Sequence, residues 1–299
     1  MTETRAMKLV VLGPGAIGSL VAAQLASAGE DVILWGREAG VSAIARVTLS
    51  GTVTLSQPVT TASGPLPPAD WYLVATKTTA NPDLIARMTR EIPSTSRILV
   101  CQNGLDPERD FEAAFGADRV LRAIFFLGAT RLAPGDVTVS FWSRPTLIGG
   151  KDPEAGSRIA QMLNHAAHPA AYTPEIRKNA WAKVILNAVS NPLCALGGRT
   201  IAEAMKDARF LPLLHEAMAV AAADGVELGA DFEEQAITLL AKTGMHRGSM
   251  WEDVRVGRPS EIAQINGRIV ALGETLGVPV ETHRDVVRAV TALGLEGKA

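Results

Sequence analysis

The sequence predicts an α/β protein in which an N-terminal domain, built on a parallel β-sheet, is followed by an all-α domain. A glycine-rich loop follows the first predicted strand and opens a helix. Up to about residue 151, short β-branched runs alternate with helical stretches, which is typical of the βαβ units of a parallel sheet. From Pro174 onward only long helical periodicities remain, so the second half is predicted to be helical.

The predicted strands are short apolar runs bounded by glycine, proline or polar residues. A turn at Pro134-Gly135 indicates a hairpin between two of them, and we expect the sheet to end near Gly150. The periodicity changes between residues 168 and 173, which predicts domains 1–170 and 171–299. The strands are expected at 9–12, 32–35, 71–75, 98–101, 120–128, 136–142 and 145–150, and the later helices at 175–191, 200–224, 231–243 and 260–277.

Residues 13–18 read G-P-G-A-I-G, between the first strand and the helix that ends at Gly29. Gly13 permits a tight turn, Gly15 lets the backbone approach a pyrophosphate, and Gly18 allows close helix–strand packing. The helix N-terminus adds amide donors and a positive dipole for the phosphates. This context predicts a Rossmann-type dinucleotide site, with a glycine turn that binds nothing as the alternative. The site would be formed by Gly13, Pro14, Gly15, Ala16, Ile17 and Gly18.

The end of the second strand selects the cofactor. An acidic residue there holds the ribose 2′-hydroxyl of NAD, whereas a basic residue accepts the 2′-phosphate of NADP. The chain reads Trp35-Gly36-Arg37-Glu38, and the planar guanidinium of Arg37 suits a phosphate. We therefore predict NADPH; an inward-pointing Glu38 would instead favour NADH.

Size, charge and cysteine usage exclude several classes of function. A chain of 299 residues is long enough for one large or two ordinary domains, and we expect two, without a disulfide or structural metal. Cys101 and Cys194 have neither metal-ligand nor redox-pair spacing. The net charge is −2 with no long basic run, which argues against nucleic acid or an anionic membrane as a partner. No apolar segment has the length of a membrane span or the pattern of a signal peptide, so we expect a cytoplasmic protein with free thiols.

Three polar residues share one face of an otherwise apolar predicted helix. Lys183, Asn187 and Asn191 recur every four residues in W-A-K-V-I-L-N-A-V-S-N-P. A buried cation and buried amides need partners, and a substrate that carries a carbonyl group would supply them. The alternative is a hydrogen-bond network between domains, with Lys183 in an ion pair. Because Asn191 precedes Pro192, we expect the helix to end or bend there.

Five further motifs are separated along the chain. They are A-T-K-T-T with Lys77, C-Q-N-G-L with Asn103, N-A-W-A-K-V-I-L-N-A-V-S-N-P-L with Lys183, G-S-M-W-E-D-V with Ser249, and G-R-P-S-E-I-A-Q-I-N-G with Glu261. With the glycine loop, they make nearly the whole chain resemble the ketopantoate reductase (2-dehydropantoate 2-reductase) family. The resemblance implies a Rossmann domain joined to a helical domain, with the active site in the cleft between them. It also implies NADPH-dependent reduction of 2-dehydropantoate to pantoate in pantothenate and coenzyme A biosynthesis.

The chemistry of the implied reaction needs a proton donor. Reduction of a ketone places a hydride on carbon and a proton on oxygen, so a protonated group must lie within hydrogen-bond reach. The resemblance gives this role to Lys183, and it implies that Glu261 binds the substrate hydroxyl and pairs with Lys183. We expect Glu261 at the start of the helix 260–277, where it would alternatively serve only as a partner of the helix dipole.

The remaining site residues follow from the same resemblance. Lys77 and Asn103 come after predicted strands, and it implies that both line the nicotinamide and substrate pocket; taken alone, they would be a surface lysine and a turn residue. Uncharged donors and acceptors would orient the carboxylate and hydroxyl of the substrate. The implied substrate-binding set is Asn103, Lys183, Asn187, Asn191, Ser249 and Glu261.

Three positions depart from the family pattern. His246 and Gly248 stand where an asparagine and a serine are frequent, and Ala263 stands where an aspartate is common. These departures leave open a different 2-oxo acid as substrate, with His246 and Arg247 either facing it or solvated. Two other classes remain: a sensor that binds NADP without turnover, and a 3-hydroxy acid or nucleotide-sugar dehydrogenase. A homodimer is compatible with the apolar helices.

Overall fold

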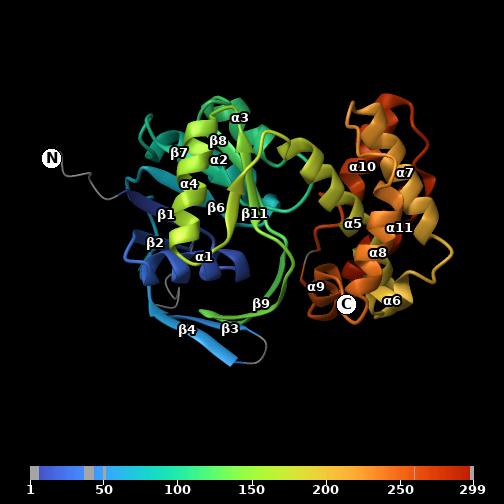
Figure 1. Ribbon diagram of the computed structural model, residues 1–299, viewed down its shortest axis with the longest axis horizontal. Helices are drawn as coiled ribbons and strands as arrows, with labels where there is room; N and C mark the ends of the chain where they lie inside the picture. The colour runs from blue at the N-terminus through green and yellow to red at the C-terminus, as the bar shows by residue number, and fades with distance from the viewer. Residues whose placement is uncertain (1–6, 37–43, 50–51, 259, 297–299) are drawn as a thin grey trace. The chain divides into compact units, whose positions relative to one another are not determined.

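The protein forms two compact units in the computed structural model, which describes residues 7–36, 44–49, 52–258 and 260–296 (Figure 1). The first, called the sheet unit below, comprises Met1–Gln102 and Pro107–Ile176. The second, called the helical unit, comprises Arg177–Ala299 and the four residues Asn103–Asp106. A short segment that follows a strand of the first unit therefore belongs to the second.

The sheet unit is built on eight strands in the order β12-β11-β8-β7-β6-β1-β2-β5. The strands from β8 to β5 are parallel, and β11 runs antiparallel to β8. The chain moves outward from β1 in both directions, which is the doubly wound arrangement that the alternating pattern predicts. The strands are β1 (Lys8–Leu12), β2 (Asp31–Trp35), β5 (Thr60–Ala62), β6 (Trp71–Val74), β7 (Arg97–Val100), β8 (Val120–Ile124), β11 (Thr146–Gly150) and β12 (Ala170–Tyr172).

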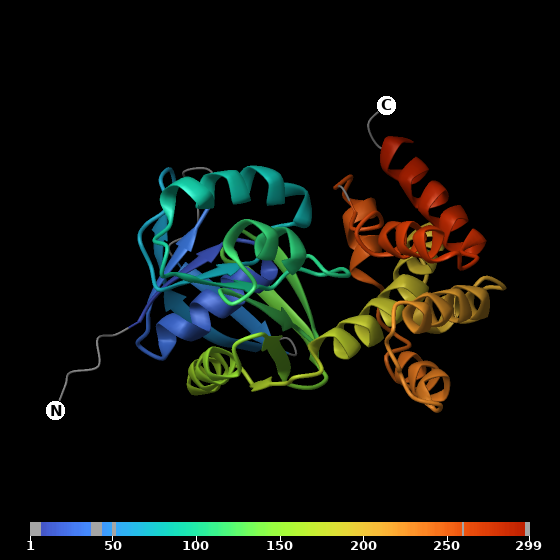
Figure 2. The same ribbon diagram turned by 90° about the horizontal axis from the view of Figure 1, so that it is seen from above.

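Helices cover both faces of this sheet (Figure 2). Within β1, Leu9 and Val11 point into one apolar core, whereas Val10 and Leu12 point into the other. Because successive side chains of a strand point to opposite faces, a strand buried on both sides is continuously apolar. Helices α1 (Ala16–Ser27) and α4 (Pro153–His165) pack on the first face, and α2 (Asn81–Glu91) and α3 (Glu108–Phe115) on the second; the 3-10 turn η1 (Thr78–Ala80) precedes α2.

A second sheet of four strands packs against α1, and the sequence did not predict it (Figure 1). Its order is β4-β3-β10-β9, with β3 at Ile44–Leu49, β4 at Thr52–Pro58, β9 at Leu127–Ala133 and β10 at Asp136–Trp142. The hairpin at Pro134-Gly135 is confirmed, since β9 and β10 pair antiparallel around it. The single strand expected at 120–128 is wrong, because the chain leaves the first sheet after Ile124 and enters the second. The first sheet also gains β12 beyond Gly150, where it was expected to end.

The helical unit surrounds α5 (Ile176–Gly197), whose Trp181, Ile185 and Val189 are fully buried. Over residues 177–258 and 260–296 it contains no strand, as the sequence predicts. The periodicity at 200–224 corresponds to two helices instead of one. The other helices are α6 (Ile201–Ala204), α7 (Phe210–Ala223), α8 (Phe232–Lys242), α9 (Ser249–Arg255), α10 (Asn266–Leu276) and α11 (Glu281–Glu296). No described helix combines the length and apolarity needed to cross a bilayer.

Helix α5 continues through Pro192 to Gly197, so it does not end at Asn191, which was one of the two expectations for this position. Proline lacks the N–H that would bond to the carbonyl four residues earlier, which belongs to Ala188. The fully buried Asn266 supplies the missing donor, because its Nδ2 lies 2.8 Å from the Ala188 oxygen. The same Nδ2 lies 3.0 Å from Nδ1 of His283. A side chain distant in sequence thus donates the hydrogen bond that the Ala188 carbonyl cannot receive from Pro192.

His168 gives the sheet unit a specific pH dependence. The ring is fully buried, with Thr146 Oγ1 2.9 Å from Nε2 and Gln24 Oε1 2.9 Å from Nδ1, and burial lowers its pKa to about 4. The unfolded chain takes up this proton near the ordinary pKa of 6.5. His168 therefore leaves the free energy of unfolding unchanged above about pH 6.5. As pH falls from about 6.5 to 4, its resistance to protonation in the fold lowers that free energy by roughly 3 kcal/mol in total.

Urea unfolding of the wild type and of His168→Gln across this pH range measures the effect. We expect the free energy of unfolding of the wild type to fall more steeply between pH 6.5 and 4 than that of the variant, because only the wild type carries this histidine. Parallel slopes for the two proteins would show that the histidine does not resist protonation in the fold.

Candidate active site

The glycine loop has the geometry that a dinucleotide phosphate requires. Gly13 has φ +108°, and a Cβ there would lie 2.9 Å from the Thr76 amide nitrogen; a Cβ on Gly18 would lie 2.0 Å from the Gly13 carbonyl oxygen. Both glycines are therefore needed by the fold. A Cβ on Gly15, the N-cap of α1, would meet nothing closer than the Ala75 oxygen at 3.9 Å. The absent side chain at Gly15 leaves the helix N-terminus open to a ligand.

Buried amides organise the neighbouring strand ends. Gln102 Nε2 donates to Asn81 Oδ1 at 2.6 Å and lies 3.2 Å from Thr76 Oγ1, and Asn81 Nδ2 donates back to Gln102 Oε1 at 3.2 Å. These bonds join the segments that follow β6 and β7 at the carboxyl edge of the sheet, where ligands bind in such folds. Lys77 is exposed at the same edge. The sequence did not predict a role for Gln102 or Asn81. The position of Gln102 directly before Asn103, at the end of a predicted strand, could have indicated that Gln102 lies at the same edge.

The predictions for the cofactor preference and for the cysteines have different outcomes. Arg37 and Glu38, which carried the cofactor prediction, lie outside the described residues. Cys101 and Cys194 are free and buried, as expected. Burial raises the pKa of Cys101 to about 12, so this thiol stays protonated at neutral pH and is a poor nucleophile.

In the helical unit, Asn103 joins Lys183 to Glu261. Lys183 Nζ donates to Asn103 Oδ1 at 2.8 Å, and Asn103 Nδ2 donates to Glu261 Oε2 at 3.2 Å. The amide thus accepts from the cation with its oxygen and donates to the carboxylate with its nitrogen. Residues almost 160 positions apart in sequence form one chain of hydrogen bonds. Glu261 does not begin a helix as expected: it precedes α10, which starts at Asn266, and a turn carries it.

The three residues that follow Asn103 each contact other residues of the helical unit. A Cβ on Gly104, which has φ +102°, would lie 2.9 Å from the Gln264 oxygen, and Leu105 is buried in the helical core. Asp106 adopts φ +52° and its Oδ1 lies 3.2 Å from Nη1 of Arg177 on α5. Arg177 also pairs with Asp224, which accepts from Trp181 Nε1 at 2.8 Å. These contacts fix the position of the Asn103 amide beside Lys183.

The other expected substrate residues lie on α5 and α9. Asn187 is half-buried one turn beyond Lys183, and Asn191 is buried one turn further on. Ser249 is exposed in the first turn of α9. A Cβ on Gly248 would lie 2.4 Å from Asn191 Oδ1, so the glycine that departs from the family pattern makes room for this asparagine. Lys183, Asn187 and Asn191 thus lie one turn apart along α5, as their four-residue spacing predicts.

The positive group considered at His246 and Arg247 lies at another part of the helical unit. The Arg247 guanidinium stacks over the Trp251 ring, 4.5 Å from its centroid. With Arg199 and Lys206 it borders an open hollow near the C-terminus of α5. Gly197 lies 14 residues beyond Lys183, and a helix of that length extends roughly 20 Å. The hollow is therefore separate from the Asn103–Lys183–Glu261 group.

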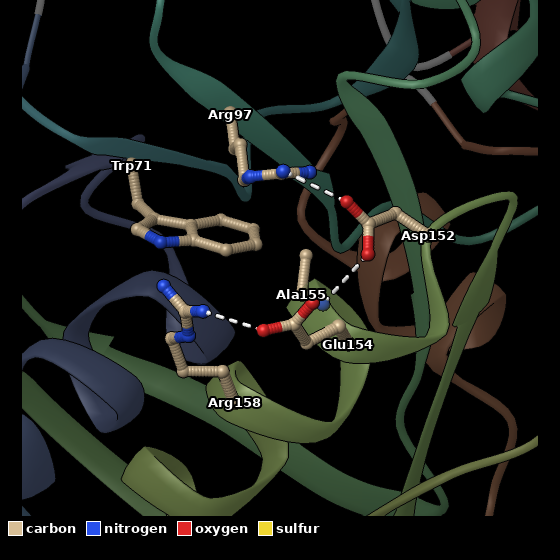
Figure 3. Close-up of a pocket in the computed structure, with 6 residues that line it drawn as sticks. All are labelled: Trp71, Arg97, Asp152, Glu154, Ala155 and Arg158. Carbon is tan, nitrogen blue, oxygen red and sulfur yellow. Dashed lines mark hydrogen bonds and ion pairs between the residues drawn. The ribbon is translucent and has the colours of Figure 1, made fainter.

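A second hollow, in the sheet unit, has a structural explanation (Figure 3). Its charges are paired: Arg97 lies 2.7 Å from Asp152 Oδ2, and Arg158 lies 3.2 Å from Glu154 Oε1. Asp152 also accepts from the Ala155 amide at 2.8 Å, and this bond lowers the pKa of the carboxyl group. Arg97 begins β7, so the hollow lies at the amino edge of the sheet, opposite the glycine loop. Its residues fasten the start of α4.

Comparison with known proteins gives the family. The model of the family "Ketopantoate reductase PanE/ApbA" matches residues 9–152, and that of its C-terminal domain matches residues 175–294. A 2-dehydropantoate 2-reductase of Caulobacter vibrioides is 27% identical, covering 96% of this chain and 99% of its own. One from Pyrococcus abyssi is 30% identical, with 91% and 93% covered. The crystal structure of 2-dehydropantoate 2-reductase from Geobacter metallireducens has a TM-score of 0.87 at 26% identity, with 96% and 99% covered. The chain therefore belongs to the ketopantoate reductase family, a family of oxidoreductases that act on the CH–OH/C=O pair.

Proposed function

We propose that this protein reduces 2-dehydropantoate to pantoate with NADPH, in pantothenate and coenzyme A biosynthesis, and that Lys183 provides the proton. The observation that carries the proposal is the hydrogen-bonded group of Lys183, Asn103 and Glu261 in a member of this family. The substrates named for the relatives supply the choice of 2-oxo acid.

The sheet unit supplies the cofactor site in this proposal. The open N-terminus of α1 at Gly15 receives the pyrophosphate. Lys77, exposed at the carboxyl edge of the same sheet, contacts the nicotinamide end. The choice of NADPH over NADH rests on Arg37 in the sequence. When bound, NADPH supplies the hydride that reduces the ketone carbon.

The helical unit supplies the groups that handle the ketone oxygen. The Lys183 ammonium donates to that oxygen, stabilises the negative charge that develops on it and transfers its proton. Asn103 holds the ammonium through its Oδ1, so the donor needs little rearrangement before the reaction. Glu261 accepts from a hydroxyl of the substrate and compensates the lysine charge through Asn103. Asn187, Asn191 and Ser249 orient the carboxylate and hydroxyl groups.

Steady-state kinetics with the purified protein test the proposal. Nicotinamide oxidation is followed with NADPH and with NADH, using 2-dehydropantoate beside branched and unbranched 2-oxo acids. We expect the highest kcat/KM with NADPH and 2-dehydropantoate. Binding of NADPH with no turnover of any 2-oxo acid would refute the enzymatic proposal and favour the sensor, whereas a preference for NADH would overturn the assignment based on Arg37.

A different 2-oxo acid is the second candidate substrate, and Gly248 favours it. Asn191 Oδ1 occupies the space that a side chain at 248 would need, so the asparagine takes a position that a serine at 248 would exclude. The same panel decides between the two: turnover that is faster with another 2-oxo acid than with 2-dehydropantoate would select this candidate.

Gly15→Ala separates cofactor binding from folding. We expect the thermal stability of the variant to stay close to wild type, because the added methyl group meets no protein atom closer than 3.9 Å. The affinity for NADPH should fall at least about 10-fold, since the methyl group obstructs close approach of the pyrophosphate to the backbone. Fluorescence titration with NADPH and a melting curve give the two values. Unchanged affinity in a folded variant would move the pyrophosphate away from this loop.

A further inference from the structure

Arg131 of β9 reaches the glycine loop from the second sheet. Its Nη1 donates to the Pro14 carbonyl oxygen at 3.0 Å. The side chain is exposed, and the described part of the chain pairs it with no carboxylate. One nitrogen of the guanidinium is thus used at the loop, and its other N–H groups are open to a solvent-borne ligand.

The topology of the sheets brings Arg131 to the phosphate end of the predicted cofactor site. The Gly13 amide donates to the Trp35 oxygen at 2.9 Å, so the loop adjoins the carboxyl end of β2. In the second sheet, Arg131 pairs with Val137, and Val137 pairs with Val47 of β3. β3 begins at Ile44, seven residues after Arg37 in sequence. Arg131 therefore lies two strands away from Val47 of β3, the strand that follows Arg37 in the sequence.

A purely structural role explains this arrangement poorly. One exposed hydrogen bond to a neutral carbonyl contributes little to stability, and a flexible arginine loses side-chain entropy to make it. A guanidinium that has no carboxylate partner among the described residues lies beside a helix N-terminus that is open to ligands. It adds a second positive group to the positive end of the helix dipole. The planar fork of arginine matches phosphate oxygens, which accept two parallel N–H bonds.

We propose that Arg131 is a cofactor-binding residue that contacts a phosphate group of the dinucleotide. The inference rests on the proposed function, because it requires that a nicotinamide dinucleotide binds to the glycine loop. Two phosphate groups share the chemistry: the pyrophosphate, present in NADH and NADPH, and the 2′-phosphate, present in NADPH alone. The contact with Pro14 fixes the guanidinium at the loop, and the charge of Arg131 attracts the phosphate.

Binding measurements with both cofactors test this inference. Dissociation constants for NADPH and NADH are measured by fluorescence titration for wild type, Arg131→Gln and Arg131→Lys. Glutamine keeps an N–H donor for the Pro14 carbonyl but removes the charge, and lysine keeps the charge but removes the fork. For Arg131→Gln we expect NADPH binding about 10-fold weaker and less dependent on salt, with partial recovery in Arg131→Lys. The matched control is Arg158→Gln, an exposed arginine at the amino edge of the same sheet unit.

The two cofactors identify which phosphate group Arg131 contacts. Equal weakening of NADPH and NADH assigns the contact to the pyrophosphate, and weakening of NADPH alone assigns it to the 2′-phosphate. If Arg131→Gln binds both cofactors as tightly as wild type and Arg158→Gln, the inference is wrong while the proposed function stands. If the wild type binds neither cofactor, the proposed function itself fails.

Discussion

Lys183→Ala is expected to lower kcat for the reduction of a 2-oxo acid by about 1,000-fold, while the dissociation constant for NADPH changes little. General acid catalysis contributes a factor of this order, and alanine offers neither a proton nor a charge to the developing alkoxide. In the proposed function the hydride donor binds to the sheet unit, and Lys183 belongs to the helical unit. The measurement combines steady-state kinetics with a fluorescence titration of NADPH.

Lys178→Ala is the matched control for this substitution. Lys178 lies on the same helix, five residues before Lys183, but its side chain is exposed. We expect its kcat to remain within about a factor of two of wild type. Asn103→Ala should give an intermediate loss, because the Lys183 ammonium is retained but its 2.8 Å partner is removed. If Lys183→Ala turns over as fast as Lys178→Ala, the lysine is not the proton donor.

Asn266→Ala is expected to lower the free energy of unfolding of the helical unit by about 2–4 kcal/mol. The substitution removes the donor at 2.8 Å from the Ala188 oxygen and the bond at 3.0 Å to His283, and both partners are left buried. The Ala188 carbonyl then has no donor, because Pro192 cannot supply one. Urea unfolding of wild type and variant measures the loss, with Thr275→Ala, an exposed position on the same helix, as control.

A second substitution tests the reason for this loss. In the Asn266→Ala background, Pro192→Ala restores a backbone N–H that can bond to the Ala188 carbonyl, so we expect it to recover about 1 kcal/mol. In the wild-type background the same change should recover less, because Asn266 already occupies that carbonyl. An equal effect of Pro192→Ala in the two backgrounds would mean that proline and asparagine are not coupled.

The sequence predicted what depends on local pattern. The first sheet could be predicted because its strands are apolar on both faces and lie next to clear helices. The glycine loop could be predicted because its function requires those residues in that order. The polar face of Lys183, Asn187 and Asn191 follows from helical periodicity alone.

The elements that were missed depend on contacts between distant residues. The second sheet pairs β3 with β10, about 90 residues later, and no local pattern encodes that pairing. Phe125 and Phe126, which connect the two sheets, are both buried, so the apolar run at 120–128 gives no sign that the chain changes sheets there. The stripe of Ile262, Ile265 and Ile269 has helical spacing, yet its first part is a turn, because burial alone does not distinguish the two.

The candidate site shows the same division. The sequence and its resemblance named Asn103, Lys183 and Glu261, but their direct bonding depends on residues that local reasoning passes over. Asp106 and Arg177 hold the Asn103 segment through an ion pair between positions 71 residues apart. The sequence shows only that Pro192 lacks a backbone N–H. The structure shows that Asn266 supplies a donor in its place, to the Ala188 carbonyl. Such compensation can be recognised once the fold brings the two segments together.

One measurement tests the central claim most directly: the fate of the hydride when 2-dehydropantoate is incubated with NADPH that carries deuterium at its transferring position. Mass spectrometry of the product should find pantoate with one deuterium on the former ketone carbon, formed in equal amount to the NADP produced, by the wild type and not by Lys183→Ala. Unconverted 2-dehydropantoate, or pantoate without deuterium, would contradict the account.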